Sequence, residues 1–163
     1  MKKILYLHGY LDEERYPDGG IIYKTLKKYL DIDYIPYSSD PFKGYKEIKD
    51  LDFSKYDLII GFSLGGIYAL SQNKIPVILI NPGFGISKRI KGFQKLEEET
   101  KDVDKDRILA VMLGKNDRFN KFYYPGIQKR GLENKIIWNS GDHVLNENVI
   151  EDEMLNNLKE LVI

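Results

Sequence analysis

The sequence predicts an α/β protein with a mostly parallel sheet of about six strands and helices on both faces. Short apolar runs of strand length alternate with longer segments in which apolar residues recur every three or four positions. The runs are continuously apolar, so both faces of each strand should be buried, as in a parallel sheet joined by right-handed crossovers. With 163 residues, 42% of them hydrophobic, the chain can bury the core of one domain, residues 1–163.

The predicted elements follow one another in a regular order. The expected strands are rich in β-branched or aromatic residues, whereas "YKTLKKYL" and "EMLNNLKELV" show helical spacing. The charged segment Lys88–Asp106 predicts a solvated helix, with a small lid over the site as the alternative. The strands are expected at Ile4–Leu7, Ile32–Pro36, Leu58–Ile60, Val77–Ile80, Ile108–Leu113 and Ile136–Trp138, and the helices at Gly20–Leu30, Leu64–Gln72, within Ile86–Thr100, at Tyr124–Arg130 and at Asn146–Leu161.

Composition and charge exclude several classes of function. Lys plus Arg and Asp plus Glu number 25 each, so no net field favours nucleic acid or an anionic membrane. The absence of cysteine excludes disulfides, thiolate metal sites and a cysteine nucleophile, and two distant histidines make a zinc site unfavourable. We therefore expect no metal and no cofactor. The apolar stretch in "MKKILYLHGY" is too short for a signal or a membrane span, which predicts a cytoplasmic location.

The stretch "IIGFSLGG" carries the strongest functional signal. Gly61, Ser63 and Gly65 fit the pattern Gly-x-Ser-x-Gly between a strand and a helix, the context of a nucleophile elbow. The sharp turn strains the serine backbone and brings the two glycines so close that side chains there would collide. The following helix start aims the N–H of Leu64 at the place where an oxyanion would form.

Two other interpretations of this turn remain open. A dinucleotide site would need a glycine where Ser63 stands and an acid at the end of the next strand, where Asn81 stands. A phosphate loop would need Gly-Lys-Ser/Thr, which "GGIY" lacks. Nucleotide binding and a purely structural glycine turn are therefore weaker alternatives to a nucleophile.

A serine needs a base and a group that orients the base. His143 lies after the last strand, where it can reach back over the elbow, whereas His8 ends the first strand. Asp117 lies in the loop after the strand Ile108–Leu113, where its carboxylate can accept the Nδ1 proton of His143. The sequence therefore predicts the triad Ser63, Asp117 and His143.

The order Ser, Asp, His is that of the α/β hydrolases. With "LYLHGY", "GFSLGG", "INP" and "GDH", the chain resembles the YqiA-like small bacterial esterases of that superfamily, from Leu5 to about Leu145. The resemblance implies a compact α/β-hydrolase fold with little or no cap. It also implies that His8 and Gly9 position the backbone N–H of Tyr10 as the second oxyanion donor.

These residues predict a serine esterase or thioesterase that acts on small acyl esters or thioesters through an acyl-enzyme. The alternatives are an acyltransferase or amidase with the same triad, and an inactive protein that keeps the scaffold for binding. Aromatic residues near the strand ends suggest an acyl pocket. Its tentative members are Tyr37, Pro82, Phe84 and Phe119.

Overall fold

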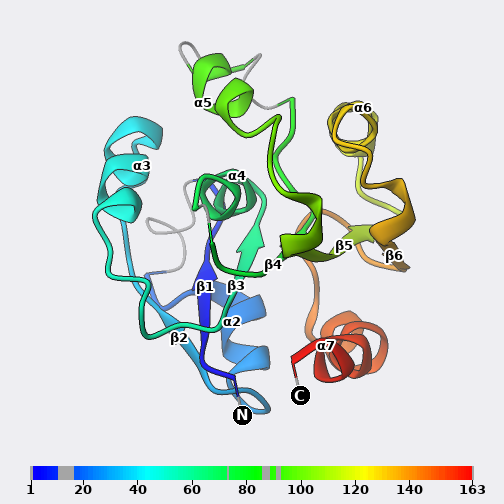
Figure 1. Ribbon diagram of the computed structural model, residues 1–163. Helices are drawn as coiled ribbons and strands as arrows, with labels where there is room; N and C mark the ends of the chain where they lie inside the picture. The colour runs from blue at the N-terminus through cyan, green and yellow to red at the C-terminus, as the bar shows by residue number, and fades with distance from the viewer. Residues whose placement is uncertain (1, 11–16, 73, 86–88, 91–92, 163) are drawn as a thin grey trace.

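The computed structural model describes residues 2–10, 17–72, 74–85, 89–90 and 93–162. Its centre is one six-stranded sheet in the order β2-β1-β3-β4-β5-β6, and every neighbouring pair is parallel (Figure 1). This confirms the predicted parallel sheet. The strands are β1 (Ile4–Leu7), β2 (Ile32–Tyr34), β3 (Leu58–Phe62), β4 (Val77–Ile80), β5 (Ile108–Gly114) and β6 (Ile136–Asn139).

Helices cover both faces of the sheet. Figure 1 shows α2 and α7 on one side of the strands and α3, α4 and α6 on the other, and the buried apolar residues form two clusters that match these sides. The first cluster includes Ile48, Ile67 and Ile127, and the second includes Ile22 and Leu158. The helices are α2 (Gly20–Leu26), α3 (Pro41–Lys49), α4 (Leu64–Leu70), α5 (Gln94–Glu99), α6 (Asn120–Lys129) and α7 (Leu155–Val162), with single 3-10 turns η2 (Lys105–Arg107) and η3 (Glu133–Lys135) and a π-helical segment η4 (Val149–Met154).

The helix α3 was not predicted from the sequence. Asp40 caps it, because its carboxylate accepts hydrogen bonds from the amides of Phe42 at 3.1 Å and Lys43 at 2.8 Å, and Pro41 occupies the first helical position. Gly44 lies inside the helix because a Cβ there would lie 2.5 Å from the Ser38 carbonyl oxygen. The Asp-Pro pair was the signal that could have revealed it.

The predicted helices have different bounds in the structure, and α2 and α4 end earlier than predicted, at Leu26 and Leu70. The expected helix Asn146–Leu161 is helical without a break from residue 147 to residue 162, and its π-helical segment η4 leads directly into α7. The expected helix Tyr124–Arg130 begins earlier, at Asn120, and tolerates Pro125 near its middle. The expected strands all occur; β1 and β4 have the predicted ends, and the other four end one or two residues from the predicted position.

The strand order indicates where on the sheet a ligand-binding site is expected. From β1 the chain moves to β2 at one side, and then to β3 at the other side of β1. Ligands of open parallel sheets bind where the order reverses in this way, at the carboxyl ends of the strands. Here those ends carry His8 after β1 and Ser63 after β3.

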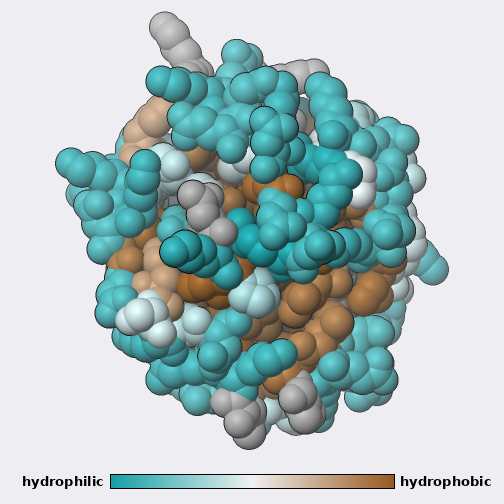
Figure 2. Space-filling view, viewed as in Figure 1, coloured by the Kyte–Doolittle hydropathy of each residue, from teal (hydrophilic) through white to brown (hydrophobic). Residues whose placement is uncertain are grey.

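Hydrophilic residues cover most of the face seen in Figure 2, and hydrophobic residues gather at its lower right, where Figure 1 has β5 above α7. Exposed large apolar side chains elsewhere include Tyr10 and Val144. Within the described part of the chain, the helices fall short of the length and apolar character that crossing a membrane requires.

Candidate active site

Ser63 stands between β3 and α4 in a strained backbone conformation, with φ 52° and ψ −116°. Such a conformation costs a non-glycine residue on the order of 1–3 kcal/mol. Hydrogen bonds hold it: the Ser63 amide donates to the Ile80 carbonyl at 3.0 Å, and the Ser63 carbonyl accepts from Gly66 at 3.1 Å and Gly83 at 2.8 Å. The turn is thereby anchored to both α4 and the end of β4.

The glycines around Ser63 permit this turn. A Cβ added at Gly61 would lie 2.7 Å from the Gly65 carbonyl oxygen. A Cβ added at Gly65 would lie 2.2 Å from the carbonyl oxygen of Leu7 and 2.5 Å from that of His8. Since real Cβ atoms do not approach backbone oxygens so closely, only glycine lets α4 pack against the end of β1.

His143 and Asp117 meet in the structure. Nδ1 of His143 lies 2.9 Å from Oδ2 of Asp117, whose other oxygen accepts the Phe119 amide at 2.7 Å. Asp117 is buried, whereas the His143 side chain keeps 21% exposure toward the pocket. Because a carboxylate can only accept, Nδ1 carries the hydrogen and Nε2 remains the nitrogen for proton transfer.

Asn81 fixes the segment that carries His143, a function that the sequence reasoning missed. Its side-chain amide donates to the carbonyls of Asp142 at 3.2 Å and His143 at 3.0 Å, and its side-chain oxygen accepts the Gly114 amide at 2.9 Å. Asn81 is fully buried and has φ 42°. An asparagine directly after a strand, where a left-handed residue can end it, is the signal that could have found it.

Tyr123 contacts the same group of residues from α6. Its hydroxyl lies 3.2 Å from Nδ1 of His143 and within hydrogen-bonding reach of Ser63. Burial and the nearby Asp117 charge raise the pKa of Tyr123, whereas the contact with Ser63 lowers it. Among the hydrogen bonds of the described residues, none joins Ser63 directly to His143. Tyr123 thus lies between the two.

Ser63, Tyr123 and His143 line one pocket of about 620 Å³. This volume is in the range of small-molecule sites. The Ser63 hydroxyl and the His143 ring border the same space, together with aromatic and charged side chains. The pocket is lined by Tyr10, Ser63, Gly85, Arg89, Ile90, Arg118, Phe119, Phe122, Tyr123, Asp142, His143 and Val144.

The turn after β1 lies beside the elbow. His8 is buried, its Nδ1 contacts the Gly9 carbonyl at 2.7 Å, and its ring stacks on Tyr37 at 3.9 Å between centroids. The Tyr37 hydroxyl donates to the His8 carbonyl at 2.5 Å. Tyr10 follows at the wall of the pocket, and Leu64 begins α4 directly after Ser63.

Of the four aromatic and proline residues expected to line an acyl pocket, only Phe119 is among the lining residues. Tyr37 is buried because it supports His8. Phe84 is fully buried, with the Arg130 guanidinium carbon 4.1 Å from its ring centroid. Pro82 is buried next to Gly66 of α4, whereas Phe122 and Tyr123, which follow Phe119 after Asp117, also line the pocket, as the aromatic residues near the strand ends suggested.

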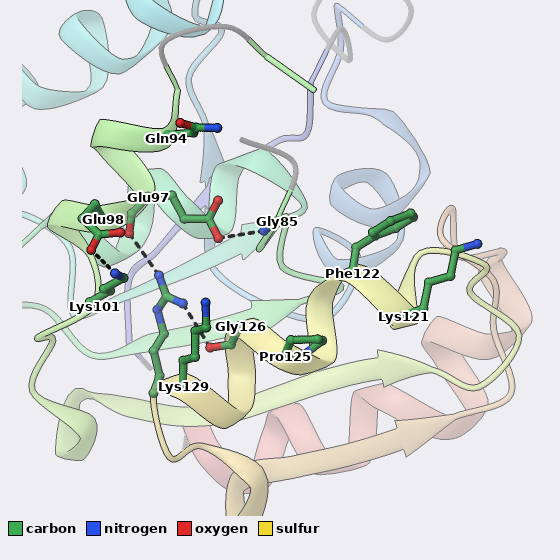
Figure 3. Close-up of a pocket in the computed structure, with 11 residues that line it drawn as sticks. Gly85, Gln94, Glu97, Glu98, Lys101, Lys121, Phe122, Pro125, Gly126 and Lys129 are labelled. Carbon is green, nitrogen blue, oxygen red and sulfur yellow. Dashed lines mark hydrogen bonds and ion pairs between the residues drawn. The ribbon is translucent and has the colours of Figure 1, made fainter. Parts of the chain in front are cut away.

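A smaller pocket of about 290 Å³ lies between α5 and α6 and shares Gly85 and Phe122 with the first (Figure 3). Figure 3 shows the Glu97 carboxylate reaching from α5 to the Gly85 amide, at 2.7 Å. Buried Arg130 donates to the carbonyls of Thr100, Gly126 and Glu97. These bonds join α5 to α6 beside the larger pocket.

Within the charged segment Lys88–Asp106, which was expected to form a solvated helix, the helix α5 covers only Gln94–Glu99. Leu96 of α5 and the preceding Phe93 are buried in the core, and Arg89 and Ile90 border the larger pocket. The lid interpretation also involves residues 86–88 and 91–92, which lie outside the described residues.

Among solved structures, the crystal structure of the esterase domain of a Rhodothermus marinus protein is similar, with a TM-score of 0.60. The two are 13% identical, over 96% of this chain and 85% of that chain. At this identity the likeness shows the fold, and it bears out the α/β class with the sheet arrangement of an esterase domain. No protein-family model and no curated protein matches the sequence.

The arrangement defines what the site can do chemically. A hydroxyl and an imidazole that line one pocket, with a buried carboxylate bonded to the imidazole, can activate an oxygen nucleophile for attack on a carbonyl. Within the described residues, no group of three or more His, Asp and Glu side chains is placed to hold a metal ion.

Proposed function

We propose that the protein is a serine hydrolase that cleaves carboxylic esters or thioesters of small acyl groups. The observation that carries this proposal is that Ser63, on a strained strand-to-helix turn, shares one pocket with His143, whose Nδ1 bonds to buried Asp117. The finer resemblance to the YqiA-like small esterases belongs to the same proposal, and the esterase-domain fold supports it.

In the proposed mechanism, Ser63 Oγ attacks the acyl carbon while its proton passes to Nε2 of His143. The backbone N–H groups of Leu64 and Tyr10 donate to the oxyanion. The leaving alcohol or thiol takes the proton from His143, which leaves an acyl-enzyme on Ser63. Water then repeats the sequence and releases the acid. Asp117 orients the imidazole and stabilises its protonated form.

Labelling with a fluorophosphonate, read by peptide mass spectrometry, tests the nucleophile. The wild type should gain the label on the Ser63 peptide, and Ser63→Ala should not. His143→Ala should slow labelling roughly a thousandfold, because the base is lost. Ser71→Ala, at the other end of α4, is the matched control and should label like the wild type.

Hydrolysis of para-nitrophenyl butyrate by the same proteins gives the catalytic readout. A folded wild type that neither labels nor hydrolyses would contradict the proposal and favour a binding protein on this scaffold. Product analysis with an added alcohol or amine separates hydrolysis from acyl transfer, and anilide substrates test amidase activity.

A further inference from the structure

Two arginines line the pocket that holds Ser63 and His143. Arg89 follows β4 through the loop at Gly85, and Arg118 follows Asp117 directly after β5. Both are exposed at the pocket, so their guanidinium groups can meet a ligand. The proposed attack on an ester carbonyl does not require either of them.

Aromatic rings bring the two cations together. The guanidinium carbons of Arg118 and Arg89 lie 4.9 Å and 5.8 Å from the centroid of the same Phe119 ring. Arg89 is also 4.9 Å from the Phe122 centroid. Stacking on a ring face supports a guanidinium while its N–H donors remain available at the edge. Two like charges over one ring repel each other, and a bound anion would relieve that repulsion.

The carboxylates nearby do not neutralise these arginines. No ion pair joins Arg89 or Arg118 to a carboxylate among the described residues. Asp117 is buried and bonded to His143, and Asp142 accepts the His143 amide at 2.6 Å. The described lining of the pocket therefore has two arginines and one exposed carboxylate, that of Asp142.

We propose that the substrate carries an anionic group, a carboxylate or a phosphate, which Arg89 and Arg118 bind while the acyl carbonyl lies against Ser63. This inference rests on the proposed hydrolase function and names the substrate class of that site. The paired N–H donors of a guanidinium match the oxygens of both anions. An anionic substrate would also be attracted by the two guanidinium charges.

Matched pairs of esters test this preference. In the leaving-group arm, para-acetoxybenzoate is compared with its neutral amide, para-acetoxybenzamide, and with para-acetoxyphenyl phosphate. In the acyl arm, mono-para-nitrophenyl adipate is compared with the para-nitrophenyl ester of a neutral branched acid of the same shape. Each kcat/KM is divided by the uncatalysed rate, which removes differences in intrinsic reactivity. The arms show which end of the substrate bears the anion and whether carboxylate or phosphate is preferred.

We expect the anionic member of at least one arm to exceed its neutral partner about tenfold in kcat/KM, as bonds to a charged group are the stronger ones. Arg89→Gln and Arg118→Gln should each remove most of that advantage, so that the ratio of kcat/KM for the anionic ester to kcat/KM for its neutral partner falls toward one. The advantage should also shrink as sodium chloride is raised, because salt screens exposed charges.

Lys121→Gln is the control for a non-specific effect of positive charge near the pocket. Its ammonium lies 5.1 Å from the Phe122 centroid, yet it lines the smaller pocket. It should keep the anionic preference. Equal losses in Lys121→Gln and the arginine variants would overturn direct binding, as would equal rates for anionic and neutral esters in both arms.

The failure of this inference is distinguishable from failure of the hydrolase proposal. A protein that labels on Ser63 and hydrolyses neutral and anionic esters equally is a hydrolase without the anion preference. Wild-type protein that neither labels nor hydrolyses any ester overturns both proposals. A far-ultraviolet circular dichroism spectrum and a Tm like those of the wild type show that the arginine variants are folded.

Discussion

Asn81 combines a strained backbone with buried side-chain bonds that reach two other loops. Its positive φ is one that asparagine adopts more readily than most residues. Its side chain joins the end of β5, at Gly114, to the segment of His143. The orientation of His143 therefore depends on a residue that lies outside the pocket lining.

A pair of substitutions separates strain from bonding at Asn81. Asn81→Gly removes the side-chain bonds but accepts φ 42°, and it should lower the free energy of unfolding by about 1–3 kcal/mol. Asn81→Ala loses the same bonds and adds strain, so it should be about 1 kcal/mol less stable still. Urea unfolding measures both, and an alanine variant more stable than the glycine variant would contradict the strain.

Removal of the Tyr123 hydroxyl should impair catalysis more than folding. Tyr123→Phe keeps the buried ring but loses the contacts with Ser63 and His143, so kcat should fall about tenfold with little change in KM. Steady-state kinetics on para-nitrophenyl butyrate measures this. Tyr124→Phe, at the exposed neighbouring position, is the control. Equal rates for the wild type and Tyr123→Phe would show that the hydroxyl has no part in the reaction.

Residues with a local sequence context could be predicted, and residues defined by distant contacts could not. Ser63 lies within a glycine pattern, and Asp117 and His143 each follow a strand, so the structure's placement of all three in one region was foreseeable. The contacts of Tyr123 and Arg89 depend on how α6 and the loop after β4 pack. No local pattern encodes such packing.

At the scale of elements, the contact between α4 and β1 is tested by two neighbouring glycines. Gly65→Ala would place a Cβ 2.2 Å from the Leu7 carbonyl oxygen and should lower the free energy of unfolding by about 2–4 kcal/mol. Gly66→Ala would meet its nearest atom, the Pro82 Cβ, at 3.3 Å. It should change stability by less than about 1 kcal/mol, because alanine favours the helix.

Urea unfolding of both variants measures the difference. Fluorophosphonate labelling of Gly65→Ala should also slow, because a shift of α4 moves Ser63. Equal stabilities for the two variants would contradict the close approach of α4 to β1.

The segment before His143 is tied to η4 by Glu153. The amide of Ser140 donates to the Glu153 carboxylate at 2.7 Å and its hydroxyl bonds there too, and these bonds lower the pKa of Glu153. A lowered folded-state pKa gives stability above the ordinary value of 4.5 that is lost as pH falls through the folded-state pKa.

Glu153→Gln should therefore have a lower Tm than the wild type above the ordinary pKa of 4.5, and the difference in Tm should shrink as the pH falls below it. The gap should be small, because the carboxylate is exposed. Thermal unfolding across this range measures it. Glu160→Gln, an exposed glutamate of α7, should show no such dependence. A difference in Tm between the wild type and Glu153→Gln that grows as the pH falls would contradict the lowered pKa of Glu153.

At the scale of the whole molecule, side chains in the central strands of the sheet are more deeply buried than those in the edge strand β6. Side chains of β3 and β4 are at most 4% exposed, whereas Trp138 in edge strand β6 is 44% exposed. Hydrogen exchange should be slowest for amides of β3 and β4 and faster for β6, because central strands open only with global unfolding. Exchange measured by mass spectrometry tests this order, and slower exchange in β6 would contradict it.

The global architecture was the most predictable feature, because burial on both faces leaves continuous apolar runs. The short apolar runs in the sequence predicted all six strands of the sheet. Helix ends were less predictable, since α2 stops at Leu26 and the last helix contains the π-helical segment η4, which residue spacing does not predict. The order of the strands depends on pairing between segments distant in sequence, which a single chain's pattern does not record.

The strand order also bears on synthesis. A chain growing on the ribosome completes β1, β3, α4 and β4 early, and these elements form the whole turn around Ser63. His143 follows β6, the last strand to be made and the far edge of the sheet. A nascent chain can thus contain the turn around Ser63 before His143 has been made, and a ribosome-bound chain truncated before β6 would lack the base of the proposed mechanism.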